Sequence, residues 1–342
     1  GGSATPTAGG AATPPAAPAA GGGPPQPPPP ESTPGAPSVR VAVQAAPGNP
    51  LAHAPLYVDR DSRPEAQAAR WESSRPADAR LLRTIAREPQ SMWLGSWYSN
   101  VRTTVSDVMG RARVARQMPV FVAYNIPYRD CFGISSGGAT TAKGYRTWIS
   151  QVAKGIGSGH AAVILEPDAL AAAPCLTKSQ ERERIGLLRW ATERLSRQPN
   201  TSVYIDAGHA RWVPAGAMAK RLRQAGVASA RGFALNVANF HTTAVNRRYG
   251  DAVSRALGGG AHYVVDTGRN GLGPRKGDWC NPPGRALGAA PTTQTGSPLM
   301  DAGLWIKAPG ESDGTCNGGP GGGAFWPSYA VGLVKRAQAV TR

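Results

Sequence analysis

Short apolar runs recur along the chain from about Asn49, and most of them are separated by segments with helical character. The runs are Leu56 to Asp59, Ser91 to Gly95, Pro119 to Asn125, Ala161 to Asp168, Ser202 to Gly208, Gly232 to Phe240, His262 to Gly268 and Gly303 to Gly310. Strands that are apolar throughout and alternate with amphipathic helices indicate a parallel sheet covered by helices. About eight such units in roughly 290 residues fit an α/β barrel better than two doubly wound domains.

One of the intervening segments carries a clear helix start. Thr177 lies three residues before Gln180, which is the spacing of a capping box. The residues that follow place one apolar stripe at helical spacing, namely Ile185, Leu188, Ala191 and Leu195. The pattern predicts a helix from about residue 178 that covers the sheet.

The first part of the chain has a different composition. Residues 1–39 contain 12 prolines, 8 glycines and a single charged side chain, Glu31. Such a segment buries too little apolar area to offset its ordering entropy, so we expect residues 1–48 to be a disordered or polyproline-like linker and residues 49–342 to form the folded domain. The linker either tethered a second module or has no role of its own. It contains no apolar signal-peptide core, so for an exported protein we expect the signal to have been removed from this sequence already.

The formal net charge of +17 comes from 38 basic and 21 acidic residues and raises the question of a polyanionic partner. Most arginines fall in the helical segments, where we predict a solvated outer face; examples are Arg182, Arg184, Arg189, Arg194 and Arg197. No run reaches the roughly 18 to 20 apolar residues of a membrane span. We therefore expect neither a nucleic acid nor a membrane as partner.

The scarce acidic residues gather where strand-like runs give way to loops. They are Asp130, Asp168, Asp206, Asp266 and Asp313. In an α/β barrel the carboxyl ends of the strands meet at one mouth, where active sites lie, so these carboxylates are expected to share a cleft. For any single Asp, a helix cap or a turn is the alternative.

Clustered carboxylates can serve metal binding or glycoside hydrolysis. The five histidines, His53, His160, His209, His241 and His262, show no HxH or HExxH spacing, so a dedicated metal site is weakly supported. The Gly-rich segments lack a phosphate-binding pattern. Hydrolysis of a glycoside needs one carboxyl kept protonated at the leaving oxygen and another group that handles the water. The cluster suits that second chemistry.

Tryptophans follow several of the strand-like runs, where their indole faces could stack on pyranose rings or pack in the core. They are Trp93, Trp97, Trp212, Trp279 and Trp326. Tyr124 lies in the strand that leads to Asp130 and faces either the cleft or the core.

Seven ordered strings make the chain resemble glycoside hydrolase family 6. They are AYNIPYRDC, VILEPDAL, VYIDAGHARW, NVANF, VDTGRNGLG, DWCNPPGRALG and LWIKAPGESDGTC. The resemblance covers about 290 residues, from Asn49 to the C-terminus. It implies a distorted, TIM-like β/α barrel of about seven to eight parallel strands, with an open cleft at the C-terminal strand ends that hydrolyses β-1,4-glucan with inversion. We expect neither a cofactor nor a metal.

The resemblance also implies roles for individual residues. Asp168 corresponds to the general acid, Asp130 to the carboxylate that raises the pKa of the acid and helps organise the water, and Asp313 to a possible base. Tyr124 matches the tyrosine at the distorted sugar, and Arg269 an arginine of the cleft. Further substrate-binding positions are Trp93, Asp206, His209, Trp212, Asn239, Trp279, Lys307 and Glu311.

The four cysteines allow three pairings. The resemblance implies Cys131 with Cys175 and Cys280 with Cys316, beside Asp130 and Asp313. Paired cysteines and a Pro-rich tether point to a secreted protein; four free thiols in a cytosolic enzyme are the alternative.

The resulting hypothesis is a secreted, monomeric bacterial endo-β-1,4-glucanase that acts on cellulose and cello-oligosaccharides. A processive cellobiohydrolase of the same family is the nearest alternative, although the compact length favours an open cleft. A catalytically silent carbohydrate-binding barrel and a polyanion-binding protein are more distant alternatives.

Overall fold

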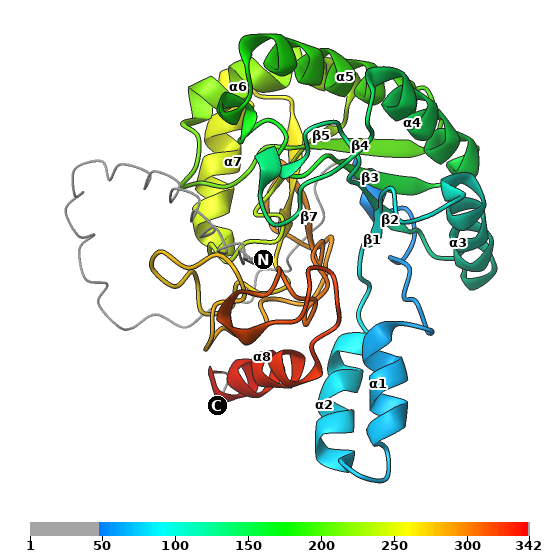
Figure 1. Ribbon diagram of the computed structural model, residues 1–342, viewed down its shortest axis with the longest axis vertical. Helices are drawn as coiled ribbons and strands as arrows, with labels where there is room; N and C mark the ends of the chain where they lie inside the picture. Colours follow the sequence, from blue (N-terminus) through cyan, green and yellow to red (C-terminus); the bar gives the residue numbers. More distant parts are fainter. Residues whose placement is uncertain (1–47, 341–342) are drawn as a thin grey trace, which may run out of the picture. The chain divides into compact units, whose positions relative to one another are not determined.

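The structure is a computed structural model that describes residues 48–340, so the predicted linker lies outside the described residues except for Gly48. Seven parallel strands form one sheet, in which each strand pairs with the next along the chain (Figure 1). The strands are β1 (Met92–Leu94), β2 (Val120–Ala123), β3 (Ala161–Leu165), β4 (Thr201–Asp206), β5 (Gly232–Leu235), β6 (His262–Asp266) and β7 (Met300–Leu304). This confirms the parallel α/β sheet, with seven strands. The run from Leu56 to Asp59 is not one of them, because only Leu56 makes an isolated bridge, to Met118.

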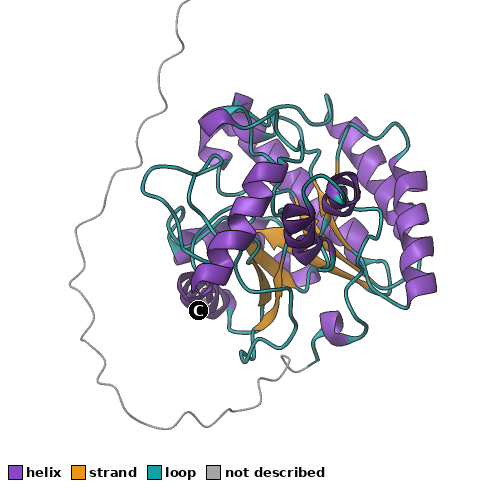
Figure 2. Ribbon diagram, turned by 90° about the horizontal axis from the view of Figure 1, so that it is seen from below, coloured by secondary structure: helices purple, strands orange, loops and turns teal. Residues whose placement is uncertain are grey.

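Helices surround the sheet, as Figure 2 shows. The helices of the described residues are α1 (Arg63–Trp71), α2 (Pro76–Ala86), α3 (Val101–Ala115), α4 (Ala142–Ile156), α5 (Lys178–Ser196), α6 (Ala215–Gln224), α7 (Thr243–Leu257) and α8 (Pro327–Val340), with the short 3-10 turns η1 (Pro50–Ala52), η2 (Asp130–Phe132), η3 (Ala173–Cys175), η4 (Val227–Ser229) and η5 (Cys316–Gly318). Five of them, α3 to α7, each follow one of the strands β1 to β5. The helices α1, α2 and α8 pack together in a separate apolar cluster.

Both faces of the sheet are buried, and alternate residues supply the two sides. Phe121 and Ala123 of β2 join the cluster under the outer helices, whereas Val120 and Val122 face the interior of the curled sheet. Leu51 of η1 packs into that interior cluster. Period-two alternation with apolar residues on both sides explains the continuous apolar runs in the sequence.

The sheet does not close into a complete barrel within the described residues. No ladder joins β1 to β7. Instead, the Ser91 N–H donates to the Trp305 carbonyl at 3.0 Å, and the Trp93 indole Nε1 donates to the Ile306 carbonyl at 2.8 Å. The distorted form of the barrel therefore arises at the β1–β7 junction.

The predicted capping box is formed at the start of α5. Thr177 caps the helix, and its side chain accepts from the Gln180 N–H. The solvated face predicted for the arginines is correct for Arg182 and Arg189 but wrong for Arg184, which is 2% exposed. Its guanidinium donates to carbonyls in the loops after β2 and β3, so it joins these loops instead of facing water.

Candidate active site

The turn after β3 carries Asp168. Its φ of +68° and that of Glu166, +51°, lie in the left-handed region, which non-glycine residues adopt at a cost that tertiary contacts must offset. The Asp168 side chain remains partly exposed. Burial within the site, together with the negative charge of Asp130, raises the pKa of Asp168 to about 7. Asp168 can therefore hold a proton near neutral pH.

Asp206 ends β4 and lies against this turn. Its Oδ2 accepts from the Asp168 N–H at 2.9 Å and from the Gly208 N–H at 3.1 Å. Its Oδ1 is buried and has no hydrogen-bond partner among the described residues. Burial, together with the charge of Asp168, raises the pKa of Asp206 well above its ordinary value. The two carboxyl groups are thus coupled, and holding both of them ionised is costly.

Asp130 lies on the loop after β2, in η2. Its Oδ2 accepts from the Ser135 N–H at 2.6 Å. Arg129 fixes the loop by donating to the carbonyls of Tyr124, Ser135 and Ser136. The disulfide between Cys131 and Cys175 ties the loop to the segment after Asp168 and confirms the first implied pairing.

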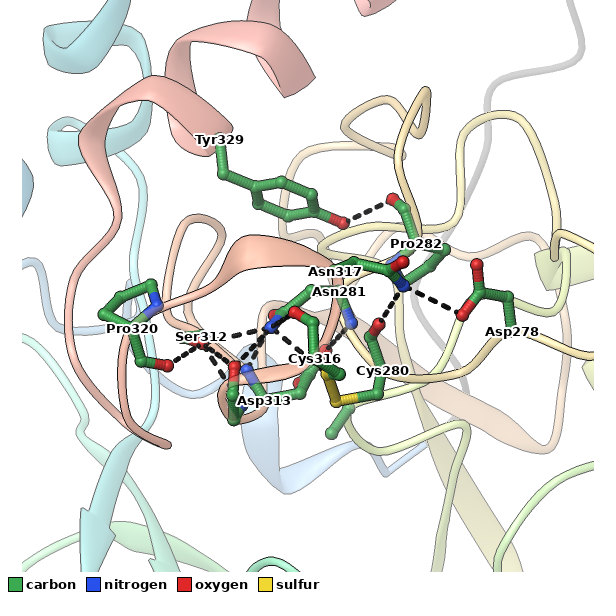
Figure 3. Close-up of a disulfide and its surroundings, with 12 residues drawn as sticks. Asp278, Cys280, Asn281, Pro282, Ser312, Asp313, Cys316, Asn317, Pro320 and Tyr329 are labelled. Atoms are coloured by element: carbon green, nitrogen blue, oxygen red, sulfur yellow. Dashed lines mark hydrogen bonds between the residues drawn. A yellow bond between two sulfur atoms is a disulfide. The ribbon is translucent and has the colours of Figure 1, made fainter.

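Asp313 lies at the opposite side of the sheet, on the loop after β7. Arg269 is 1% exposed and donates to both carboxylate oxygens, at 2.8 and 2.9 Å. Asn281 donates its N–H to Oδ2 at 2.9 Å and accepts the Asp313 N–H on its side-chain oxygen at 2.8 Å (Figure 3). Both carboxylate oxygens of Asp313 are therefore engaged in hydrogen bonds.

The second disulfide encloses this loop. Cys280 and Cys316 are joined, as Figure 3 shows, which confirms the second implied pairing. The Asn281 side chain donates to the Gly314 carbonyl at 2.7 Å and to the Ser312 hydroxyl at 3.1 Å. The loop that carries Asp313 is thus held by a covalent bond and by one amide side chain.

Tyr124, Trp93 and Lys307 come together between these two carboxylate groups. The Tyr124 and Trp93 rings meet edge to face at 5.1 Å. The Lys307 ammonium lies 5.6 Å from the Trp93 ring centroid, 4.0 Å from Asp313 and 3.9 Å from Glu311. Burial, with the charges of Asp168 and Asp130, raises the pKa of Tyr124. This side of the site can offer a phenol, an indole face and a cation to a polyol.

His209 and Trp212 lie on the loop after β4, with ring centroids 5.4 Å apart. His241 stacks on His209 at 4.3 Å. Burial, together with the neighbouring His241, lowers the pKa of His209 to about 3. Neutral imidazoles and an exposed indole form a surface that suits an uncharged sugar.

The remaining predicted residues are more scattered. Asn239, on the loop after β5, accepts the Phe240 N–H on its own side-chain oxygen. Trp279 is 55% exposed beside Cys280. Trp326 stacks on Tyr329 at 5.1 Å within the cluster of α1, α2 and α8, so it packs instead of facing the cleft.

Asp266 is buried like Asp206 but differs from it because both of its carboxylate oxygens have hydrogen-bond partners. It is 2% exposed, and its oxygens accept from four backbone N–H groups, those of Ala238, Gly268, Ile306 and Lys307. The expectation that it shares the cleft is wrong, because every oxygen is already used to join the ends of β5, β6 and β7. It is a structural residue.

Two further residues position the site and were missed by the reasoning from sequence. Glu166 is 1% exposed and accepts the N–H groups of Asn125 and Ile126 at 3.0 to 3.1 Å. Burial raises the pKa of Glu166 to about 7. Asn281 is the second. The sequence could have indicated Glu166, because it is a carboxyl at a strand end two residues before Asp168. Asn281 could not have been found in this way, because its contacts are with residues distant in sequence.

Within residues 48–340, no three His, Cys, Asp or Glu side chains are grouped so as to hold a metal ion. The arrangement is instead a row of carboxyl groups of differing protonation, flanked by aromatic rings and buried cations. Such a row can deliver a proton to a bound substrate and stabilise positive charge that develops beside it.

Comparisons with known proteins agree on one family. Residues 51–337 match the model described as glycosyl hydrolases family 6. The chain is 44% identical over 287 residues to endoglucanase A of Cellulomonas fimi, and the match covers 83% of this chain but only 61% of that protein. It is 32% identical over 323 residues to 1,4-beta-D-glucan cellobiohydrolase C of Emericella nidulans, which covers 79% of this chain and 70% of that protein.

A solved structure is similar over the whole of its chain. This is the endoglucanase Cel6 from Mycobacterium tuberculosis in complex with methyl-cellobiosyl-4-deoxy-4-thio-β-D-cellobioside. The TM-score is 0.81 at 49% identity, and the match covers 85% of this chain and all of that one.

Proposed function

The chain belongs to glycosyl hydrolase family 6, and on this premise we propose that it hydrolyses internal β-1,4 bonds of cellulose with inversion at the anomeric carbon. The observation that carries the proposal is Asp168, a partly exposed carboxyl with its pKa raised to about 7 between Asp130 and Asp206. The similarity to endoglucanases supports the substrate class.

In this mechanism Asp168 gives its proton to the glycosidic oxygen while the bond from that oxygen to the anomeric carbon breaks. A water attacks the same carbon from the opposite face and loses a proton, so the product anomer is inverted. The charge of Asp130 supports the protonated state of Asp168 and faces the positive charge that develops on the sugar. Tyr124 and Trp93 position the sugar ring.

Asp313 is the candidate base, but its contacts favour an indirect role. Both oxygens already accept from Arg269, and Asn281 adds a third hydrogen bond. The lone pairs that would accept a proton from water are therefore already largely occupied by donors. We propose that Asp313 holds Arg269 and Lys307 in place, and that the proton from water reaches solvent or a carboxylate through a relay.

An open cleft is favoured over an enclosed one by the exposure of the candidate sugar-binding rings. Trp212 and Trp279 are 42% and 55% exposed. A processive cellobiohydrolase, the second candidate, would be expected to cover such rings with loops.

The endo assignment predicts a fast loss of viscosity on carboxymethylcellulose relative to the release of reducing ends. Random internal cuts shorten a polymer more per bond broken than cuts at its ends. Viscometry and a reducing-sugar assay on one reaction check this, and polarimetry shows whether the first product is the α-anomer. A slow fall in viscosity with cellobiose as nearly the sole product would instead support the cellobiohydrolase.

The pH profile follows from the raised pKa of Asp168. The acid must be protonated, so kcat/KM should fall as the pH rises through about 7. In Asp130→Asn the neighbouring negative charge is gone, the pKa of Asp168 falls, and this alkaline limb should move to lower pH.

The residual activity of Asp130→Asn is measured from pH 4 to 9 on cellotetraose, with Asp107→Asn on the exposed face of α3 as the control. The control should keep the wild-type limb. An unchanged alkaline limb in Asp130→Asn would show that Asp130 does not raise the pKa of Asp168.

We further propose an extracellular, monomeric enzyme that needs no cofactor and binds neither nucleic acid nor a membrane. The two disulfides support an oxidising compartment. Within residues 48–340, no helix combines the length and apolarity needed to cross a bilayer. Neutral histidines and exposed indoles at the site favour an uncharged polysaccharide despite the net charge of +17.

A further inference from the structure

Trp97 is a large apolar side chain that the mechanism above does not use. It lies on the loop between β1 and α3, beyond the C-terminal end of β1, and is 52% exposed. Among the described residues, the other tryptophans with large exposed area are Trp212 and Trp279, which also lie on loops at the candidate site. Exposed indoles at this end of the sheet are therefore a shared feature of the cleft.

The backbone below Trp97 is shaped to receive its ring. A Cβ added to Gly95 would lie 2.2 Å from Cζ3 and 2.4 Å from Cη2 of the indole. The φ of Gly95 is not in the left-handed region, so the backbone itself does not require glycine there. The missing side chain instead lets the indole lie directly against the main chain at Gly95.

Arg129 connects this ring to the site. Its guanidinium carbon lies 5.7 Å from the Trp97 ring centroid and 4.4 Å from that of Tyr124. The same guanidinium donates to the Tyr124 carbonyl at 2.8 Å. Because Tyr124 meets Trp93 at 5.1 Å, Trp97 stands at the outer end of a row of rings that leads to the candidate reaction centre.

We propose that Trp97 is a sugar-binding platform that stacks on a glucose unit of the chain outside the reacting sugar, at the β1 side of the cleft. The inference rests on the proposed function. An indole that lies against the main chain on one side and is 52% exposed matches the apolar face of a pyranose. The guanidinium of Arg129 is close enough for a favourable cation–π interaction with the rings of both Trp97 and Tyr124. The platform would favour long glucan chains over short oligosaccharides.

The test is Trp97→Ala, assayed on cello-oligosaccharides from the trimer to the hexamer. We expect kcat/KM for cellohexaose to fall about tenfold through KM, the size of one lost aromatic contact, while the shortest cleaved oligosaccharide is turned over as by wild type. The control is Trp190→Ala on α5, where Arg146 lies at a similar 5.9 Å from the ring. The control should leave the dependence on chain length unchanged.

Gly95→Ala provides a second variant that keeps the indole but displaces it. It should reproduce the selective loss on cellohexaose, and the double variant should lose no more than Trp97→Ala alone, because the two changes act on one ring. The dissociation constant of cellohexaose, measured by calorimetry in an Asp168→Asn background, should rise by the same factor without any contribution from turnover.

The outcomes separate this inference from the proposed function. A wild-type protein with no activity on any β-1,4-glucan would contradict the function itself. An active wild type combined with equal losses on all chain lengths, or with no loss in Trp97→Ala, would overturn the platform alone.

Discussion

Asp168→Asn should lose about 10²- to 10⁴-fold in kcat on cellulose and on cellotetraose, because general acid catalysis typically contributes that much. The amide fills the same space and cannot donate a proton to the glycosidic oxygen as an acid. The backbone N–H of residue 168 still reaches Asp206, so the turn should keep its shape. The measurement is the initial rate at several pH values. A thermal melt confirms that the variant is folded.

A substrate with a good leaving group separates lost acid chemistry from lost binding. Dinitrophenyl cellobioside needs little protonation, so Asp168→Asn should turn it over with a far smaller deficit than it shows on cellotetraose. Asp107→Asn, exposed on α3, is the matched control and should behave as wild type on both substrates. Near-normal hydrolysis of cellulose by Asp168→Asn would eliminate the acid assignment.

Asp266→Ala should destabilise the fold by about 3 to 5 kcal/mol, because four buried or partly buried N–H groups lose their acceptor together. Asp266→Asn should not restore the wild-type stability. Its oxygen can replace only one carboxylate oxygen, and its amide nitrogen would face two donors. The measurement is the free energy of unfolding from a urea titration, at a temperature where both variants fold.

Asp266→Ala should also disturb the candidate active site. Two of the four N–H groups belong to Ala238 and Lys307, and the Ala238 carbonyl accepts from Arg269. Activity should therefore fall even where the variant is folded. Asp107→Ala should change the free energy of unfolding by less than about 0.5 kcal/mol, as exposed substitutions generally do. A stability within 1 kcal/mol of wild type for Asp266→Ala would show that the four N–H groups find other partners.

Arg184 and Asp266 show where reasoning from pattern fails. Arg184 lies on a helix rich in exposed charge, and nothing local marks it as the one that turns inward to bind three loop carbonyls. Asp266 ends its strand as Asp206 does, yet both of its oxygens accept hydrogen bonds from the ends of β5, β6 and β7. The three partners of Arg184 lie 15 to 57 residues away in the chain, and three of the four partners of Asp266 lie 28 to 41 residues away. Burial is therefore decided by packing and not by local sequence.

The sequence by itself determined the elements whose signals are local: the alternation of apolar runs and helices, the capping box at Thr177, and the placement of carboxyl groups at strand ends. The tertiary structure decided which carboxyl has a raised pKa, which is paired with a buried arginine and which only joins strands. Asp168 with Asp206, and Asp313 with Arg269 and Asn281, are paired across 32 to 44 residues. A carboxyl group takes its pKa from burial and from the charges and donors around it, and these exist only once the chain has folded.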